Sequence, residues 1–180
     1  MTLKQNLKKK FQENFKENVK LSNYSWFNLG GKAEYFFKAE NKKQLIYFLK
    51  EIKTYDLSTT IVGAGSNILF RDNGVKGVVI KLGKIFSYTK LIGKNIIETG
   101  GATLDKKVAD FAKNNNLGNL EFLSCIPGSI GGGIIMNTGC YENDISKVLL
   151  SIRAIDKSKF KEIEIKKEDI NFLYRKTDLS

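Results

Sequence analysis

The feature that most constrains the fold is the segment TTIVGAGSNILF, residues 59–70. Two apolar runs flank the sequence Gly-Ala-Gly-Ser-Asn at residues 63–67. A plain turn needs only one or two residues of these types, which tolerate unusual backbone angles. Four of them within five positions predict more than a plain turn at the tip of a buried strand. They also predict that the backbone beyond this strand passes close to another group.

Two further segments are rich in glycine. The sequence IPGSIGGGIIMNTG covers residues 126–139 and contains the only proline of the chain, Pro127. A glycine pair, Gly100 and Gly101, ends a predicted strand at residues 95–102. Close packing of a helix on a sheet would explain such segments structurally. Three of them at strand ends of two lobes favour instead a long ligand with a pyrophosphate in its middle.

The common dinucleotide and nucleotide motifs are missing. In a G-x-G-x-x-G motif the third glycine would stand where this chain has Ile68, and no acidic residue follows at 78–84. A Walker A sequence is also absent. Residues 63–67 are therefore predicted to bind phosphate through a nest of backbone N–H groups, with help from Ser66 and Asn67. A plain tight turn is the alternative.

Hydrophobic periodicity predicts helices and strands that alternate without a clean βαβ repeat. This pattern favours an α+β fold in two lobes, with an N-terminal helix at 1–20, a first lobe at 21–82 and a second lobe at 83–180. The predicted strands are 33–40, 58–65, 77–82, 95–102, 147–156 and 160–167, the last two paired antiparallel. The predicted helices are 3–19, 41–55 with an Asn41 cap, and 103–118 with a Thr103 cap and a stop at Gly118.

The net charge of +11 raises the possibility of a nucleic-acid partner. Only three of the 30 basic residues are arginines, however, and the lysines are scattered. Proteins that bind nucleic acids favour arginine and interleaved aromatic residues. We therefore expect no nucleic-acid partner.

Other function classes are limited by what the composition lacks. No apolar run reaches the length of a membrane span, and the N-terminus does not resemble a signal peptide, so we expect a cytoplasmic protein without a membrane partner. The absence of histidine excludes a Ser-His-Asp triad, a His-ligated zinc site and a histidyl flavin linkage, and we expect no metal. Cys125 and Cys140 are expected to be reduced thiols.

Five segments together resemble the UDP-N-acetylenolpyruvoylglucosamine reductases, which are also called UDP-N-acetylmuramate dehydrogenases. They are YSWFNLGGKAEYFF, VGAGSNILFRDNGVKGVVI, ETGGATL, LEFLSCIPGSIGGGIIMNTGCY and INFLYRKT, and their order and spacing match over roughly residues 20–180. The resemblance implies the two-lobed FAD-binding domain of the vanillyl-alcohol-oxidase (PCMH) type, with non-covalent FAD. An FAD oxidoreductase of the same domain family that acts on an alcohol or a sugar is the alternative.

The resemblance also implies roles for particular residues. The FAD pyrophosphate would lie on Gly63, Ala64, Gly65, Ser66 and Asn67. The isoalloxazine would lie near Gly100, Gly101 and the 126–132 segment. Cofactor-binding residues there would be Ile126, Pro127, Gly128, Ser129, Gly131 and Gly132, with Asn137 further along. Tyr174 and Arg175 would bind the substrate, and Arg175 would be catalytic.

The reaction implied is the transfer of hydride from NADPH, by way of the flavin, to the enolpyruvyl group of a UDP-sugar in peptidoglycan synthesis. Such a step would link the chain to the cell wall, cell shape and cell division. The sequence departs from the family pattern at Cys125, Cys140, Glu142 and Thr177. It also ends at YRKTDLS, before the family's proton-donating serine and assisting glutamate. We therefore expect a truncated chain that lacks the third, substrate-binding domain, binds FAD and is inactive alone, with its oligomeric state left open.

Overall fold

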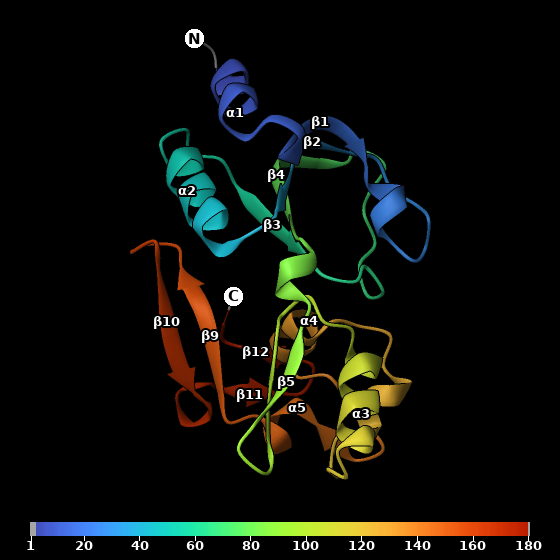
Figure 1. Ribbon diagram of the computed structural model, residues 1–180. Helices are drawn as coiled ribbons and strands as arrows, with labels where there is room; N and C mark the ends of the chain where they lie inside the picture. The colour runs from blue at the N-terminus through green and yellow to red at the C-terminus, as the bar shows by residue number, and fades with distance from the viewer. Residues whose placement is uncertain (1–2, 180) are drawn as a thin grey trace. The chain divides into compact units, whose positions relative to one another are not determined.

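The computed structural model describes residues 3–179 and forms two compact units that divide between Ile85 and Phe86 (Figure 1). The sequence places the boundary between its lobes after residue 82. Met1, Thr2 and Ser180, at the ends of the first and last predicted segments, lie outside the described residues. Within residues 3–179, no helix combines the length and the apolar composition that crossing a membrane requires.

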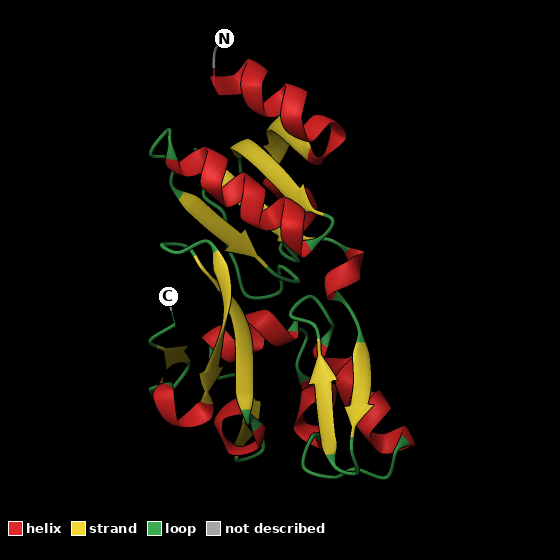
Figure 2. Cartoon of the chain, turned by 60° about the vertical axis from the view of Figure 1, so that its left-hand side comes forward, coloured by secondary structure: helices red, strands yellow, loops and turns green. Residues whose placement is uncertain are grey.

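The first unit is built on a four-stranded sheet with the strand order β1-β2-β4-β3. The pair β1–β2 is antiparallel, whereas β2–β4 and β3–β4 are parallel. Helix α2 packs on this sheet (Figure 2), and the rings of Phe37 and Phe48 stack with their centroids 3.7 Å apart. The elements are α1 (Leu3–Phe11), η1 (Gln12–Asn14), β1 (Phe15–Lys20), η2 (Leu21–Tyr24), β2 (Lys32–Ala39), α2 (Lys42–Lys53), β3 (Thr59–Val62), β4 (Val75–Leu82) and η3 (Lys84–Phe86), which crosses the boundary.

Local signals in this unit predict four of its elements correctly. The side chain of Asn41 accepts a hydrogen bond from the backbone N–H of Gln44 at 2.8 Å and caps α2, as the sequence predicts. The strands β2, β3 and β4 and helix α2 are confirmed within a few residues.

The predicted helix at 3–19 is wrong beyond its first half. Helix α1 ends at Phe11, Gln12 has a φ of 47°, and residues 15–20 form strand β1. The reason lies in the four-residue spacing of Leu7, Phe11, Phe15 and Val19, because four residues fit both a helical turn and two strand repeats. In β1 the burial alternates, with Phe15 inside and its neighbours more exposed, as a strand requires.

The second unit consists of short helices and four two-stranded antiparallel sheets within the described residues. The β5–β6 and β9–β10 pairs form separate ribbons (Figure 2). Its core contains Val108, Ala109, Phe122, Leu123, Ile130 and Ile145. The elements are β5 (Thr89–Ile92), β6 (Ile96–Thr99), α3 (Asp105–Asn114), η4 (Glu121–Cys125), α4 (Ile130–Ile135), β7 (Gly139–Cys140), β8 (Asn143–Asp144), α5 (Ile145–Val148), β9 (Ser151–Asp156), β10 (Lys161–Lys166), η5 (Lys167–Asp169), β11 (Phe172–Leu173) and β12 (Lys176–Thr177).

The predicted ends of the helix at 103–118 need correction. The hydroxyl of Thr103 donates to the carbonyl oxygen of Tyr88 at 2.9 Å instead of capping α3, and the helix starts at Asp105 without a side-chain cap. At the other end α3 finishes at Asn114, and Asn116 adopts a left-handed φ of 55°. Asparagine tolerates this conformation, so the chain turns before it reaches Gly118. The predicted antiparallel pair β9–β10 is confirmed.

Candidate functional site

The loop at residues 63–67 follows β3 and is fixed by a segment about 40 residues earlier in the chain. Gly65 has a left-handed φ of 79°, and its carbonyl oxygen accepts a hydrogen bond from the N–H of Trp26 at 2.9 Å. A Cβ atom at Gly65 would overlap the carbonyl oxygen of Tyr24. This glycine is therefore required by the protein's own backbone, before any ligand is considered.

The N–H groups of this loop remain available to a ligand. Among the hydrogen bonds of residues 3–179, none uses the backbone N–H of Ala64, Gly65, Ser66 or Asn67. Ala64, Gly65 and Ser66 are buried or partly buried, and such N–H groups are nearly always paired, so these unpaired donors beside a left-handed glycine could bind an anion. The loop at 63–67 has the donors that a phosphate group needs.

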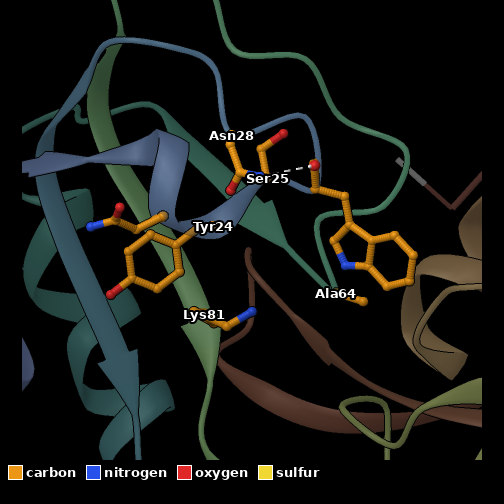
Figure 3. Close-up of a pocket in the computed structure, with 7 residues that line it drawn as sticks. Tyr24, Ser25, Asn28, Ala64 and Lys81 are labelled. Atoms are coloured by element: carbon orange, nitrogen blue, oxygen red, sulfur yellow. Dashed lines mark hydrogen bonds between the residues drawn. The ribbon is translucent and has the colours of Figure 1, made fainter.

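An open pocket of about 570 Å³ lies beside this loop (Figure 3). The hydroxyl of Ser25 donates to the carbonyl oxygen of Ile68 at 2.9 Å and accepts from the N–H of Phe27, which joins the 23–28 segment to the chain that follows the loop. The residues that line the pocket are Asn23, Tyr24, Ser25, Trp26, Asn28, Ala64 and Lys81. Of these, sequence reasoning finds only Ala64. The polar and aromatic run NYSWFN before a glycine pair could have indicated the residues at 23–28, whereas Lys81 has no such local signal.

The glycine segments of the second unit are joined directly to each other. The N–H of Gly131 donates to the carbonyl oxygen of Gly101 at 2.9 Å. The N–H of Gly100 donates to the carbonyl oxygen of Tyr88. Residues 130–135 form helix α4, so the prediction that this cluster lies at a strand end is wrong. A Cβ atom at Gly131 would lie 2.9 Å from the carbonyl oxygen of Gly101 and one at Gly133 would lie 3.0 Å from Thr138, so tight packing accounts for both glycines.

Gly132 differs from its neighbours in α4. It is exposed, and an added Cβ atom would meet only the Ser129 hydroxyl, at an ordinary contact distance of 3.6 Å. Packing inside the protein does not require a glycine at this position. Of the glycines of α4, Gly132 is therefore the one whose surface is open to a ligand.

A buried carboxyl group lies beneath the glycine-rich segment. Asp105 is fully buried, and one of its oxygens occupies the space where a Cβ atom of Gly128 would be. Neither carboxyl oxygen has a hydrogen-bond partner among the described residues, and the same is true of the buried Ser129 hydroxyl. Burial raises the pKa of Asp105 from 3.8 to about 7. Sequence reasoning missed Asp105, which reads as an ordinary acidic residue in a first helical turn.

Tyr174 and Arg175 lie at the tip of the β11–β12 hairpin. Arg175 has a left-handed φ of 56°, and its guanidinium carbon lies 5.4 Å from the centre of the Tyr174 ring, which is 90% exposed. The hydroxyl of Thr177 donates to the carbonyl oxygen of Ile135 at 3.1 Å. The side-chain amide of Asn137 donates to the carbonyl oxygen of Leu173 at 3.3 Å. The hairpin is thus tied to α4, the helix that contains Gly131 and Gly132.

The other predicted residues of this unit have mixed environments. The Asn137 side chain is buried and also accepts a hydrogen bond from the N–H of Ser146 at 3.1 Å, so the protein itself uses this amide. Pro127 is exposed and Ile126 is partly buried, and both immediately precede Gly128. The structure therefore brings together in the second unit the 100–101 pair, the 126–132 segment and the Arg175 hairpin.

Residues 33–159 match the family model described as "FAD binding domain". The chain belongs to this FAD-binding domain family. It is 46% identical over 166 residues to the UDP-N-acetylenolpyruvoylglucosamine reductase of Pelagibacter ubique (strain HTCC1062), a match that covers 92% of this chain and 54% of the relative. The chain thus spans about half the length of the curated relatives it matches.

Two solved structures have the same fold as this FAD-binding domain. The crystal structure of UDP-N-acetylenolpyruvylglucosamine reductase from Thermus caldophilus superposes with a TM-score of 0.78 at 27% identity, covering 91% of this chain and 57% of that one. The crystal structure of p-cresol methylhydroxylase with substrate bound superposes with a TM-score of 0.63 at 15% identity, covering 90% of this chain and 35% of that one. At this low identity the likeness is evidence for the fold alone. The predicted α+β, PCMH-type fold and the predicted resemblance to the reductases are confirmed.

The residues of this FAD-binding domain fit the cofactor that its family name implies. The 63–67 loop offers unpaired N–H groups and a left-handed glycine to a pyrophosphate. Gly132 and Pro127 are exposed on the second unit, where a flat ring could approach the backbone. Within residues 3–179 no group of three acidic or cysteine side chains is placed to hold a metal ion.

Proposed function

We propose that this FAD-binding domain serves an NADPH-dependent UDP-N-acetylenolpyruvoylglucosamine reductase of the cytoplasm, which forms UDP-N-acetylmuramate for peptidoglycan. FAD is bound without a covalent link, and NADPH is the reductant. The proposal is supported by the 46% identity to a reductase of this name and by the reductase structure with a TM-score of 0.78. UDP-sugar and NADPH are the partners, and neither nucleic acid nor a membrane is involved.

The observation that carries this proposal is the set of unpaired N–H groups at residues 64–67. These donors hold the pyrophosphate, and Ser66 and Asn67 add a hydroxyl and an amide. The segments 100–101 and 126–132, with Asn137, would hold the isoalloxazine. When bound, FAD supplies the transfer of two electrons from NADPH to the enolpyruvyl double bond.

Arg175 binds and orients the substrate's carboxylate in this proposal. Its planar guanidinium can give two parallel hydrogen bonds to a carboxylate, which a lysine cannot do. The neighbouring Tyr174 ring lies against the guanidinium, and the hydrogen bonds of Thr177 and Asn137 hold the hairpin on α4. The positive charge therefore sits on an anchored turn, where it can stabilise negative charge that develops next to the substrate's carboxylate.

Flavin titration tests this proposal. The purified chain is expected to quench the fluorescence of added FAD and to release flavin on denaturation. In a protein that joins this chain to a third, substrate-binding domain, the UDP-enolpyruvyl sugar should then perturb the visible spectrum of the bound flavin. Arg175→Ala should keep FAD binding and lose this perturbation, whereas Lys176→Ala removes a neighbouring exposed charge and should keep both. A parent protein that never binds FAD would exclude the proposed function, and an unchanged sugar response in Arg175→Ala would exclude the role of Arg175.

A further inference from the structure

We propose that Lys81, in strand β4, is a specificity-determining residue beside the 63–67 loop: its ammonium group pairs with a phosphate oxygen of the ligand that the loop holds. The inference rests on the proposed function in one respect, because it takes that ligand to be the pyrophosphate of FAD. The class of ligand is broader than FAD, since Lys81 should favour any pyrophosphate ester over the same molecule without phosphate.

The sheet places Lys81 beside the beginning of the loop. Lys81 lies in β4 opposite Val62, the last residue of β3, and the loop starts at the next residue. Its ammonium nitrogen donates to the carbonyl oxygen of Gly63 at 2.6 Å. Figure 3 shows the side chain in the pocket between Tyr24 and Ala64, and the nitrogen lies 5.9 Å from the centre of the Tyr24 ring. The strand register therefore fixes a cation at the loop.

This cation has no counter-ion in the part of the chain that the structure describes. The salt bridges of residues 3–179 join Lys4, Lys10 and other lysines to carboxylates, but none of these carboxylates pairs with Lys81. Burial lowers the pKa of the Lys81 ammonium, whereas neighbouring glutamates raise the pKa values of Lys4 and Lys10. Partial burial of a cation without an anion is unfavourable, and a bound anion would reverse this effect.

The loop and Lys81 offer complementary donors to the same kind of group. The N–H groups of residues 64–67 are unpaired, and the ammonium has three N–H bonds, of which the bond to Gly63 uses one. Ala64 and Lys81 line the same pocket. A doubly charged pyrophosphate can accept charge-assisted hydrogen bonds from the backbone nest and from the ammonium at once, whereas a neutral ligand can accept only weaker ones.

Binding measurements with three probes test the proposal. FAD, ADP and riboflavin are titrated into the parent chain, Lys81→Met and the control Lys76→Met, which removes an exposed lysine of the same strand. Loss of a charge-assisted hydrogen bond should weaken FAD and ADP binding to Lys81→Met by about tenfold or more. Riboflavin binding should be the same in all three proteins, and Lys76→Met should match the parent throughout.

A second measurement needs no variant and applies even if Lys81→Met does not fold. Chemical acetylation of the parent chain is followed residue by residue by mass spectrometry. Saturating ADP should slow the modification of Lys81 several-fold and leave that of Lys76 unchanged. The comparison uses two lysines of one strand, so a general change in reactivity would affect both.

The outcomes separate this inference from the proposed function. Equal FAD and ADP affinities in the parent and Lys81→Met, or acetylation of Lys81 that ADP does not slow, would overturn the role of Lys81 while FAD binding stands. A parent chain that binds ADP in a Lys81-dependent way but not FAD would support the pyrophosphate site and overturn the proposed function. A parent chain that binds neither FAD nor ADP would overturn both.

Discussion

The two long glycine-rich segments have similar compositions and different physical roles. In the first unit, the N–H groups of residues 64–67 have no partner among the described residues. In the second unit, the N–H groups of Gly131 and Gly133 donate to the carbonyl oxygens of Gly101 and Ser129. Glycine permits close packing in both segments, at Gly65 and at Gly131, and in the first segment the neighbouring donors also remain free.

The charges beside the two segments also differ in sign. The cation of Lys81 donates to the carbonyl oxygen of Gly63, whereas the carboxyl of Asp105 is buried against Gly128. A phosphate would be attracted to the first segment, and an ionised Asp105 would repel it from the second. This difference supports the proposed pyrophosphate site at residues 63–67 and the proposed contact of residues 126–132 with an uncharged ring.

Substitution of Gly65 should give the largest effect and tests whether the first loop is fixed by its own backbone. Gly65→Ala should lower the free energy of unfolding by about 4 kcal/mol or more, because the methyl group meets the carbonyl oxygen of Tyr24 at a left-handed φ. Gly93 is the matched control, since it has a φ of 64° and open space around it. Gly93→Ala should lose only about 1 kcal/mol from backbone strain. Denaturant unfolding of both variants provides the measurement, and equal losses would show that the Tyr24 contact is unimportant.

Asp105 should make the stability of the second segment depend on pH. Because its folded pKa of about 7 lies above the ordinary 3.8, the folded protein holds this proton more tightly than the unfolded chain. The contribution of Asp105 to the free energy of unfolding should therefore fall as pH rises from about 4 to 7. The total loss is at most about 4 kcal/mol at higher pH, since each pKa unit corresponds to about 1.36 kcal/mol.

The isosteric variant Asp105→Asn isolates this contribution. Relative to the parent protein it should gain stability as pH rises through this window, and the difference should level off above about pH 7. Asp110→Asn, which changes an exposed acid of the same helix, is the matched control. A difference between Asp105→Asn and the parent that stays constant from pH 4 to 8 would mean that the buried carboxyl does not titrate in this range.

The sequence predicts the elements whose signals are local. Helix α2 has a capping Asn41 and a regular apolar stripe within 15 residues, and the strand β10 alternates between exposed and partly buried residues. The strand β1 is missed because Phe15 and Val19 are four residues apart, a spacing that a helix and a strand share. Local patterns identify an element only where one periodicity fits and the other does not.

The candidate site is predictable to the extent that its residues share a segment. The glycines of the 63–67 loop are evident in the sequence, but Gly65 is required by Tyr24, which lies about 40 residues earlier. Lys81 comes next to the loop only through the register of β3 on β4. Asp105 reads as a solvent-exposed helix start, because its burial depends on Gly128. Residues that meet only in the folded protein give no local signal in the sequence. For this reason the sequence does not indicate Lys81 beside the first segment or Asp105 beside the second.

Substitution of Gly132 should have the smallest effect on stability and gives the sharpest test of the second segment. Gly132→Ala should raise the free energy of unfolding by about 0.5–1 kcal/mol, because alanine is favoured over glycine within a helix and space for a methyl group is present. If a flat ring lies against this backbone, the same methyl group should weaken FAD binding by about tenfold, equivalent to about 1.4 kcal/mol. Stability and affinity would then change in opposite directions, which a packing role alone cannot produce. Thermal unfolding and FAD titration of Gly132→Ala provide the two measurements, and a variant with unchanged FAD affinity would show that the isoalloxazine does not contact Gly132.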